Sequence, residues 1–512
     1  MSESRSVDRS VVPLTTVALF AMLAGAAALR FWQLGRGIPY AIGVDEPEIM
    51  DRVLRMVKTG DFNPRFFHYP TLFFYLQVPV VCLRFLIGAS SGRWVSLDQV
   101  TPEDFYLWSR ALAALFGTAT VYVTYRIGSR WGARQALIAG ALLAVMPMHV
   151  RESHYILTDV PMTFFVALTL LLSLRAHERP TTWAFAAAGA SAGLAMATKY
   201  TAVVALILPL TAAIMSDAPA AVRVPGGVAA VLAAGAAFLG GAPYTLLDLP
   251  GFLNGFGDLA RSYRPRGPND ESGLAIYLKY LRRGFGWPAT IIAGGGAVLA
   301  ATQLRRGSSA LKWALLLFFP VLFLWLIQGR GLIYGRYLLP IVPFVSVLAA
   351  VALVWICDGL ARFGTPRVSS TLSLTVLVLA VLVGPATQAV EFDRNLGRPS
   401  TQEVVYRWVL TNLPPGSRIV MEKADLHLQG DRYHVTNAAS LLGRTAEQYR
   451  ADGVDYLIAT SQAFGPVFAS PDRHRQAHDG YTALFATARE LLRVEPGDDR
   501  SGPELRVLKV AP

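Results

Sequence analysis

Long apolar stretches alternate with short polar segments along most of the chain. Several stretches of roughly 17–20 residues carry almost no charge and are long enough to cross the hydrocarbon core of a membrane. The predicted spans are 11–33, 105–127, 135–150, 160–177, 182–198, 200–216, 226–242, 287–303, 312–328, 337–356 and 369–390. The pattern therefore predicts an α-helical polytopic membrane domain over residues 1–390, with about eleven transmembrane helices.

One further apolar segment, 70–88, decides the predicted topology. If it crossed the membrane, Arg126, Arg130 and Arg134 would lie outside, against the tendency of Arg and Lys to stay on the cytoplasmic side. We therefore expect 70–88 to stay at the external surface, with the N-terminus cytoplasmic. The predicted external loops are then 34–104 and 243–286. We expect 243–286, which Gly251, Gly255 and Gly257 would leave supple, to lie as a lid over a cleft at this face. The alternative is a solvated basic loop that touches lipid headgroups.

The composition of the chain changes after Glu391, where charged residues become frequent and apolar runs shorten to strand length. Residues 400–412 have helical periodicity and end before Pro414, Pro415 and Gly416, which stop a helix. Three short runs are predicted as strands, namely 418–421, 454–459 and 505–510. Residues 391–512 should thus form a small α/β domain, which we expect on the extracytoplasmic side.

Composition and charge narrow the class of protein. Hydrophobic residues make up 53% and charged residues 16% of the chain, and the net charge is +12. The arginines are scattered among the predicted membrane loops, so the positive-inside rule accounts for the charge and no nucleic-acid partner is predicted. The two cysteines, Cys82 and Cys357, lie in apolar surroundings and predict neither a disulfide framework nor a thiolate metal site.

Two acidic turns between apolar stretches are the main candidates for chemistry. In each, an Asp stands two residues before a Pro, as Asp45 and Asp159 do. Ionisable groups at the edge of a bilayer are costly and suggest function. Helix capping is the alternative for both: Asp45 would cap a helix with Glu48 in a capping box, and Asp159 would cap the fourth span. Capping leaves Glu46, a second carboxylate beside Asp45, unexplained.

Cationic and aromatic residues near the same predicted face complete the set of candidates. Lys199 interrupts an apolar stretch, and Arg336 heads a span; both are suited to an anionic lipid headgroup. The alternative is that such side chains reach out to the lipid headgroups. The further candidates are Arg110 and Arg330 for phosphate, and His68, Tyr69, Arg151 and His154 for substrate or a possible metal.

Taken together and in this order, these segments resemble the polytopic glycosyltransferases of the GT-C class. The resemblance is to the branch of protein O-mannosyltransferases and the bacterial lipid A aminoarabinose transferase. It extends over residues 40–345 and rests on Asp45-Glu46, His68–Tyr75, Arg110–Gly117, Arg151–Pro161, Ala197–Tyr200 and Arg336–Pro340. Tyr69 departs from the proline that this family often has, and the C-terminal domain does not resemble the sugar-binding repeats of the eukaryotic members.

The resemblance implies an integral-membrane, inverting hexosyl- or pentosyltransferase of the bacterial inner membrane. It would move a sugar from a polyprenyl phosphate to a hydroxyl of a glycan, lipid or protein. Asp45 would be the general base, Glu46 would orient the acceptor or the base, and Lys199 and Arg336 would stabilise the leaving phosphate. Asp159 would hold a donor hydroxyl or join Asp45 around a divalent cation such as Mg²⁺ or Mn²⁺.

The alternative from another class is a transporter or flippase of a lipid-linked or anionic solute. Transporters usually place ionisable groups near the midplane of the membrane, on broken helices in repeated halves. Here the candidate groups gather at one predicted face, and we find no internal repeat, so we favour the enzyme. The identity of the sugar, the acceptor and any metal, the oligomeric state and the role of the C-terminal domain stay open at the level of sequence.

Overall fold

The computed structural model describes residues 14–39, 43, 45–267, 271–305, 310–363, 370–422, 426–428 and 432–510. It divides into two compact units. The first comprises 1–34, 49–101 and 107–390, and the second comprises 35–48, 102–106 and 391–512. The division after Val390 falls where the composition of the sequence changes, but the second unit also takes two segments of the predicted loop 34–104. Residues 11–13 and 369, at the ends of two predicted spans, lie outside the described residues.

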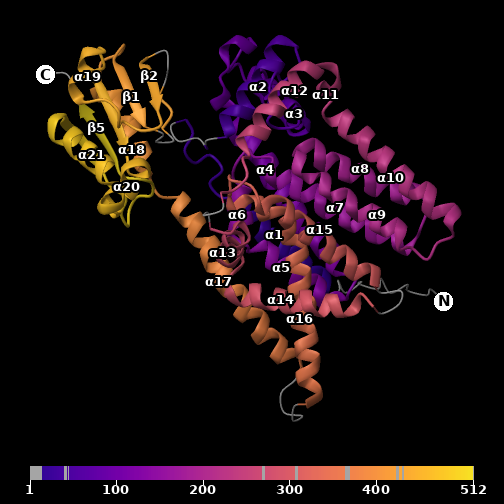
Figure 1. The fold of residues 1–512 in the computed structure, drawn as a ribbon. Coiled ribbons are helices and arrows are strands. Elements are labelled where there is room, and N and C mark those ends of the chain that lie inside the picture. The colour runs from indigo at the N-terminus through magenta and orange to yellow at the C-terminus, as the bar shows by residue number, and fades with distance from the viewer. Residues whose placement is uncertain are drawn as a thin grey trace, which may run out of the picture. The chain divides into compact units, whose positions relative to one another are not determined.

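The chain up to residue 396 is built of helices (Figure 1). The α-helices are α1 (Leu14–Phe31), α2 (Glu46–Thr59), α3 (Leu72–Ser90), α4 (Tyr106–Gly128), α5 (Ala133–Ala144), α6 (Pro147–Glu152), α7 (Asp159–Glu178), α8 (Thr182–Thr198), α9 (Ile207–Ile214), α10 (Ala220–Gly241), α11 (Tyr244–Leu247), α12 (Leu249–Ser262), α13 (Gly273–Phe285), α14 (Trp287–Gln303), α15 (Ala310–Gln328), α16 (Val342–Phe363) and α17 (Ser370–Leu396). The 3₁₀ helices are η1 (Leu97–Gln99), η2 (Pro102–Asp104), η3 (Tyr200–Leu206) and η5 (Gly335–Ile341).

The prediction of a helical polytopic membrane protein is confirmed. Each predicted span coincides with one helix or with two consecutive helices, such as α5 and α6 for 135–150. That span breaks where Pro147 starts α6, because a proline has no N–H with which to continue the ladder of α5. Within the described residues, six helices are long and apolar enough to cross a membrane, or seven if α13 and α14, bent by 119°, form one span. The number eleven stays a prediction.

Helix α3 contains most of the segment 70–88, which we expected to stay at the external surface. It is 19 residues long with a mean hydropathy of 1.9, so its length and composition also permit a crossing. Only 28% of its apolar window is buried inside the protein, and the helix packs against α8. Its external placement stays a prediction that rests on the distribution of arginines.

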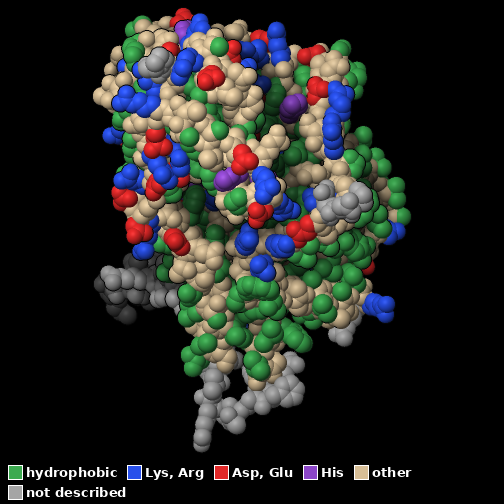
Figure 2. Space-filling model, turned by 60° about the vertical axis from the view of Figure 1, so that its left-hand side comes forward, with side chains coloured by type: hydrophobic (Ala, Val, Ile, Leu, Met, Phe, Trp, Pro, Cys, Tyr) green, Lys and Arg blue, Asp and Glu red, His purple; other side chains and the backbone are tan. Residues whose placement is uncertain are grey.

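Burial separates central helices of the first unit from peripheral ones. The span formed by η5 and α16 is 89% buried, whereas those of α10 and α17 are 17% and 22% buried. Between Leu372 and Val383 most outward side chains of α17 are apolar, among them Leu372, Val376, Leu379 and Val383. The face drawn in Figure 2 has hydrophobic side chains and hardly any charged ones over its lower part. Helices α16 and α17 lie in the lower part of Figure 1. Such surface is suited to lipid, which cannot hydrate polar groups.

Two helices of the first unit approach each other through small residues. A Cβ added at Gly189 of α8 would lie 2.0 Å from the carbonyl oxygen of Ala230 in α10, and one at Gly193 would lie 2.1 Å from that of Ala234. The spacing of four residues on both helices is the small-xxx-small pattern that lets membrane helices pack backbone to backbone. Glycine is therefore required here by the close approach of the two helices.

We expect Gly189→Ala to lower the thermal stability of the purified protein, because the new methyl group would force α8 and α10 apart at a cost of about 1–3 kcal/mol. The measurement is the unfolding temperature in detergent. Gly235→Ala in α10 is the matched control, since a Cβ there meets nothing within 4 Å. It should leave stability unchanged or raise it, because Ala is the better helix former. Equal unfolding temperatures for both variants and the wild type would contradict the packing argument.

The second unit contains a five-stranded sheet of order β2-β1-β3-β5-β4 (Figure 1). Its strands are β1 (Arg418–Glu422), β2 (His434–Ala438), β3 (Tyr456–Thr460), β4 (Arg489–Val494) and β5 (Leu505–Lys509), and its helices are α18 (Thr401–Asn412), α19 (Ala446–Ala451), α20 (Ser461–Ala469) and α21 (Arg475–Thr487). Strand β1 pairs in parallel with β2 and β3, while β5 is antiparallel to β3 and β4. The predicted α/β sheet domain is therefore confirmed. Within this domain, the buried carboxylate of Glu422 at the end of β1 accepts hydrogen bonds from the N–H groups of Leu441 at 2.8 Å and Thr460 at 2.9 Å.

Candidate active site

A cavity of about 250 Å³ lies within the first unit and is lined by both polar and apolar side chains. The polar lining residues are Asp159, Lys199, Arg330, His68, Thr201 and five tyrosines, Tyr69, Tyr200, Tyr263, Tyr277 and Tyr337. The apolar lining residues are Met162, Val203, Phe256, Leu259, Ala260, Phe323, Leu326, Ile327 and Leu332. A cavity of this kind fits an amphiphilic ligand with a polar head and a hydrocarbon portion.

The predicted charged residues Asp159 and Lys199 line this cavity, and a third, Arg336, contacts Asp159 but is not among the described residues that line it. Lys199 Nζ lies 2.7 Å from Asp159 Oδ1, and Arg336 Nε lies 3.7 Å from Asp159 Oδ2. The side chain of Asp159 is 3% exposed and that of Lys199 is 10% exposed. Lys199 Nζ also lies 4.4 Å from the centroid of the Tyr337 ring, within range of a cation–π contact. The buried carboxylate of Glu152 also interacts electrostatically with Asp159 and Arg336, so two carboxylates and two cations lie close together here.

The local sequence explains how these residues reach the cavity. Asp159 is the first residue of α7, and Thr158 occupies the N-cap position, so the alternative of Asp159 as N-cap is wrong. Lys199 ends α8 in an extended conformation, with φ −153° and ψ 128°, which turns the chain into η3. Its ammonium is held by a carboxylate inside the protein, so the structure does not place it among lipid headgroups as the alternative for Lys199 required.

The segment 243–286, expected to be a supple loop over the cleft, is folded into α11, α12 and α13. Phe256, Leu259, Ala260 and Tyr263 of α12 line the cavity, so this helix forms its roof. The glycines that suggested a flexible loop lie within α12, and a Cβ at Gly255 would come within 3.0 Å of Phe67 Cβ. The described part of this segment is therefore largely helical, and Gly255 serves a close helix contact, while the flexibility of the segment stays a prediction.

The roof helix α12 is held at both of its ends. At its N-terminus Asn63 Nδ2 donates to Asp248 Oδ2 at 2.8 Å. Beyond its C-terminus, Gly331 N donates to Arg264 O at 2.7 Å and Arg266 N donates to Gly329 O at 3.1 Å. Tyr263 and Tyr337 add a hydrogen bond between their hydroxyl groups at 2.9 Å. These contacts join α12 to the connection before α3 and to the connection between α15 and η5.

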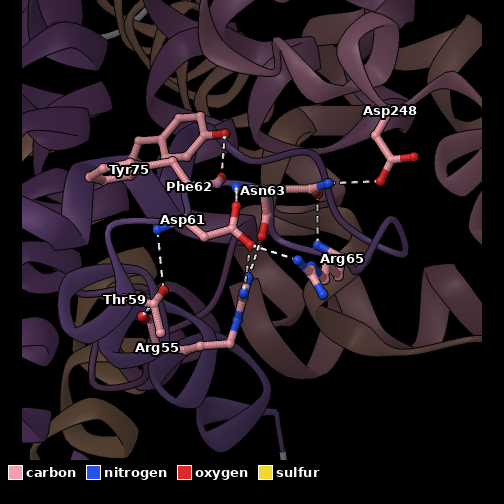
Figure 3. Close-up of polar contacts among 8 residues, drawn as sticks. All are labelled: Arg55, Thr59, Asp61, Phe62, Asn63, Arg65, Tyr75 and Asp248. Atoms are coloured by element: carbon pink, nitrogen blue, oxygen red, sulfur yellow. Dashed lines mark hydrogen bonds and ion pairs between the residues drawn. The ribbon is translucent and has the colours of Figure 1, made fainter.

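The connection between α2 and α3 is organised by a polar network (Figure 3). Asp61 Oδ1 accepts the N–H of Asn63 at 3.0 Å, and Asp61 Oδ2 lies 3.0 Å from Arg65 Nη2 and 3.3 Å from Arg55 Nη1. The N–H of Asn63, with help from Arg55 and Arg65, holds the pKa of the Asp61 carboxyl below its usual value. Tyr75 of α3 donates to Phe62 O at 3.1 Å. The chain that follows, with His68 and Tyr69, is thus brought to the cavity by a fixed turn.

Other predicted candidates have structural partners away from the cavity. Arg110 Nη1 donates to Leu34 O at 2.9 Å, and the side chain is buried. His154 is buried with its two ring nitrogens 2.9 Å from Val150 O and 3.0 Å from Trp32 O. Arg151 Nε donates to Glu152 Oε1 at 2.9 Å. Among the residues that the structure describes, none of these three lines the cavity, whereas Arg330 does.

Arg30 is a buried charged residue that the sequence analysis missed. Its guanidinium donates to Leu143 O at 3.0 Å and Ala144 O at 2.9 Å, which are the last carbonyls of α5, and to His149 Nδ1 at 3.1 Å. A guanidinium can only donate, so His149 accepts at Nδ1 and is in the tautomer protonated at Nε2. In the sequence Arg30 looks like the ordinary cationic end of a span, and only the fold shows that it satisfies the end of another helix.

The predicted catalytic pair, Asp45 and Glu46, belongs to the second unit. Glu46 is fully buried, and its Oε2 accepts the N–H of Gly43 at 2.8 Å, while its own N–H donates to Gly43 O at 3.0 Å. Glu46 thus closes the turn before α2, the kind of bond that a capping box assigns to the third helical residue. Asp45, directly before α2, is partly exposed and is the more accessible of the two carboxylates.

The cavity does not fit a divalent metal ion at Asp159. Both carboxylate oxygens face a cation, Lys199 or Arg336, and these would repel the metal. Across the described ranges, no group of three or more His, Cys, Asp or Glu side chains is placed to hold a metal ion. The use of Mg²⁺ or Mn²⁺ stays a prediction, and we derive no step through it.

Comparison with known proteins gives the fold a name. Residues 89–250 match the family model of dolichyl-phosphate-mannose-protein mannosyltransferase. No curated protein matches the chain by sequence. Among solved structures, the apo ArnT of Cupriavidus metallidurans is similar with a TM-score of 0.58 at 15% identity, covering 98% of this chain and 99% of that chain.

Two further structures are similar to this chain. ArnT of the same organism bound to undecaprenyl phosphate has a TM-score of 0.56 at 14% identity, covering 97% of this chain and 98% of that chain. The apo oligosaccharyltransferase of Archaeoglobus fulgidus has a TM-score of 0.58 at 12% identity, covering 93% and 73%. The chain therefore has the GT-C fold, and its predicted resemblance to the polytopic membrane glycosyltransferases of that class is confirmed.

Proposed function

We propose that the protein is an integral-membrane inverting glycosyltransferase that moves a hexose or pentose from a polyprenyl phosphate to an acceptor hydroxyl. The observation that carries the proposal is the buried pair of Lys199 and Asp159, which Arg336 contacts, in a cavity that is also lined by apolar side chains, in a GT-C fold. We further propose that the reaction takes place on the extracytoplasmic face of a bacterial inner membrane, with the N-terminus cytoplasmic and the C-terminal domain outside. The acceptor can be a glycan, a lipid or a protein.

The charges of the cavity suit the leaving group of such a reaction. When the bond between the sugar and the phosphate oxygen breaks, that oxygen takes the electron pair and the phosphate gains negative charge. The cations of Lys199 and Arg336 would stabilise this charge more than they stabilise the intact donor, which is the requirement for catalysis. Asp159 orients the two cations.

The apolar lining residues suit the lipid part of the donor. Phe256, Leu259 and Ala260 of the roof face the same cavity as Phe323 and Ile327 of α15. These side chains can bury the first isoprene units, at about 0.8 kcal/mol per buried CH₂ group. The similar ArnT structure that contains undecaprenyl phosphate supports a ligand of this class.

The acceptor hydroxyl needs a base, and we propose Asp45 for this role. Its carboxylate would take the proton as the acceptor oxygen forms the new bond to the sugar from the side opposite the leaving phosphate. Glu46 would act on the base indirectly, through the turn that it closes on Gly43.

The test uses the purified full-length protein in detergent. Undecaprenyl phosphate should raise its unfolding temperature in a saturable manner, because a ligand that binds only the folded state stabilises it. In cells, mass spectrometry of lipid-linked sugars and envelope glycans with and without the gene should reveal accumulated polyprenyl-phosphate sugar and a shortened glycan. A transporter or flippase would instead move the labelled lipid across a proteoliposome membrane without breaking its sugar–phosphate bond, and that result would overturn the enzyme.

A further inference from the structure

Two walls of the cavity come from distant parts of the chain and are joined by a hydrogen-bonded pair of side chains. The connection between α2 and α3 supplies His68 and Tyr69, and α12 supplies the roof. Asn63 of this connection and Asp248, directly before α12, are 185 residues apart in the sequence and are hydrogen-bonded at 2.8 Å. Figure 3 shows the amide of Asn63 and the carboxylate of Asp248 pointing toward each other.

The carboxylate of Asp248 accepts two hydrogen bonds. Its Oδ1 accepts the N–H of Gly251 at 3.1 Å and so caps the N-terminus of α12, while its Oδ2 accepts from Asn63. The group that starts the roof helix is therefore the group that fixes it to the opposite wall. A hydrogen bond to an ionised carboxylate is stronger than a neutral one, so this contact resists a shift of α12.

Asn63 is itself held in place from several directions. Its N–H donates to Asp61 Oδ1 and its Oδ1 accepts the N–H of Arg65, both at 3.0 Å. Its carbonyl oxygen accepts from Arg55 of α2. The amide group is thus presented to Asp248 in one orientation, and its position is tied to α2 and to the turn that leads to His68 (Figure 3).

An aromatic contact lies beside this pair along α12. The rings of Phe67 and Phe252 meet edge to face with centroids 5.9 Å apart, and Gly255 leaves room for Phe67. An apolar contact is non-directional, whereas the hydrogen bond between Asn63 and Asp248 requires one distance and direction. The polar pair therefore sets the register of the roof over His68 and Tyr69.

We propose that Asn63 and Asp248 are positioning residues that set how α12 lies over the donor cavity, and thereby the affinity for the donor. The proposal rests on the proposed function for its effect on the donor, but its structural part does not. A misplacement of about 1 Å far from the reacting atoms can lower a rate by up to about a hundredfold, which gives such a pair a large influence.

The test is an exchange of the two side chains. In Asn63→Asp, two carboxylates face each other and the hydrogen bond is lost. In Asp248→Asn, two amide groups face each other if the new side chain keeps its oxygen on the N–H of Gly251. Asn is as good an N-cap as Asp, so the second variant leaves the start of α12 intact. In the double variant, Asn at 248 can donate to Asp at 63, which restores the bond with its polarity reversed and the net charge unchanged.

We expect each single variant to raise the KM for a polyprenyl-phosphate sugar, and the dissociation constant of undecaprenyl phosphate, about tenfold. The double variant should return both to within about threefold of the wild type. Hydrogen exchange of the α12 amides should be faster in the single variants and slower again in the double variant, whether or not the protein transfers a sugar. Asn412→Asp, at the exposed end of α18 where Asn412 donates to Trp408 O, is the matched control and should change none of these values.

The outcomes separate this proposal from the proposed function. The role of the pair would be overturned if hydrogen exchange of the α12 amides were unchanged in the single variants. It would also be overturned if the KM and the dissociation constant of the double variant were no lower than those of the single variants. The proposed function would be overturned if the wild-type protein bound neither the polyprenyl-phosphate sugar nor undecaprenyl phosphate. If the α12 amides still exchanged faster in the single variants and slower in the double variant, the pair would remain the element that positions α12.

Discussion

An Asp45→Asn variant is expected to insert and fold like the wild-type protein and to lose about a hundredfold or more of its sugar transfer. A general base contributes about 10²–10⁴ to a rate, and an amide cannot accept the acceptor proton. Asp45 is partly exposed before α2, whereas Glu46 is buried on the N–H of Gly43, so Asp45 is the better placed of the two to meet an acceptor. The measurement is the turnover number with a polyprenyl-phosphate sugar at saturating acceptor.

The substitution separates catalysis from helix capping, because Asn is also a good N-cap. Glu48→Gln is the matched control, since Glu48 lies in the first turn of the same helix and is exposed. It should retain nearly all activity. Turnover of Asp45→Asn close to that of the wild type would remove Asp45 as the base and return it to a structural role at the start of α2.

The second large effect is expected for Lys199→Met, in donor binding and in stability. Loss of the ammonium removes a charge-assisted contact to phosphate, so the affinity for undecaprenyl phosphate should fall at least tenfold. It also leaves Asp159, whose side chain is 3% exposed, with only Arg336 at 3.7 Å. Removing one partner of a buried pair typically costs about 3 kcal/mol or more, so the unfolding temperature should fall as well.

A double variant distinguishes the two effects. Asp159→Asn combined with Lys199→Met removes the carboxylate together with its partner ammonium. No unpaired charge of Asp159 is then left buried, so most of the lost stability should return. Binding of undecaprenyl phosphate should stay weak, because the phosphate still lacks the ammonium. Recovery of binding together with stability would show that Lys199 only supports the fold, and unchanged affinity in the single variant would lead to the same conclusion.

The helices of the membrane domain could be predicted because their signal is local. A run of apolar residues that is long enough to cross a bilayer has few alternatives to a helix, since its backbone must bond within itself. Helix α18 and strands β1, β3 and β5 could also be predicted, because the apolar residues of each follow a regular pattern. Strand β2 was missed because its sequence, His434–Ala438, is mostly polar and exposed at the edge of the sheet.

Other elements were misread because one local pattern serves two structures. Polar residues and glycines made 243–286 look like a loop, but α12 and α13 need polar residues on their outer sides, and Gly255 makes room for Phe67. The sequence did contain one unused signal: Asp248 stands two residues before Pro250, as Asp45 and Asp159 stand before their prolines. That spacing marks the start of α12 with Asp248 as its cap.

The sequence by itself determined that this is a polytopic helical membrane protein with a small α/β domain, and which ionisable residues stand at the ends of its spans. Only the tertiary structure decided which of those residues meet. Lys199 and Arg336 gather on Asp159, whereas Arg110, Arg151 and His154 are bonded elsewhere. The reason is that hydrophobic periodicity fixes the axis and face of each helix, while a contact between distant residues depends on how all the helices pack together.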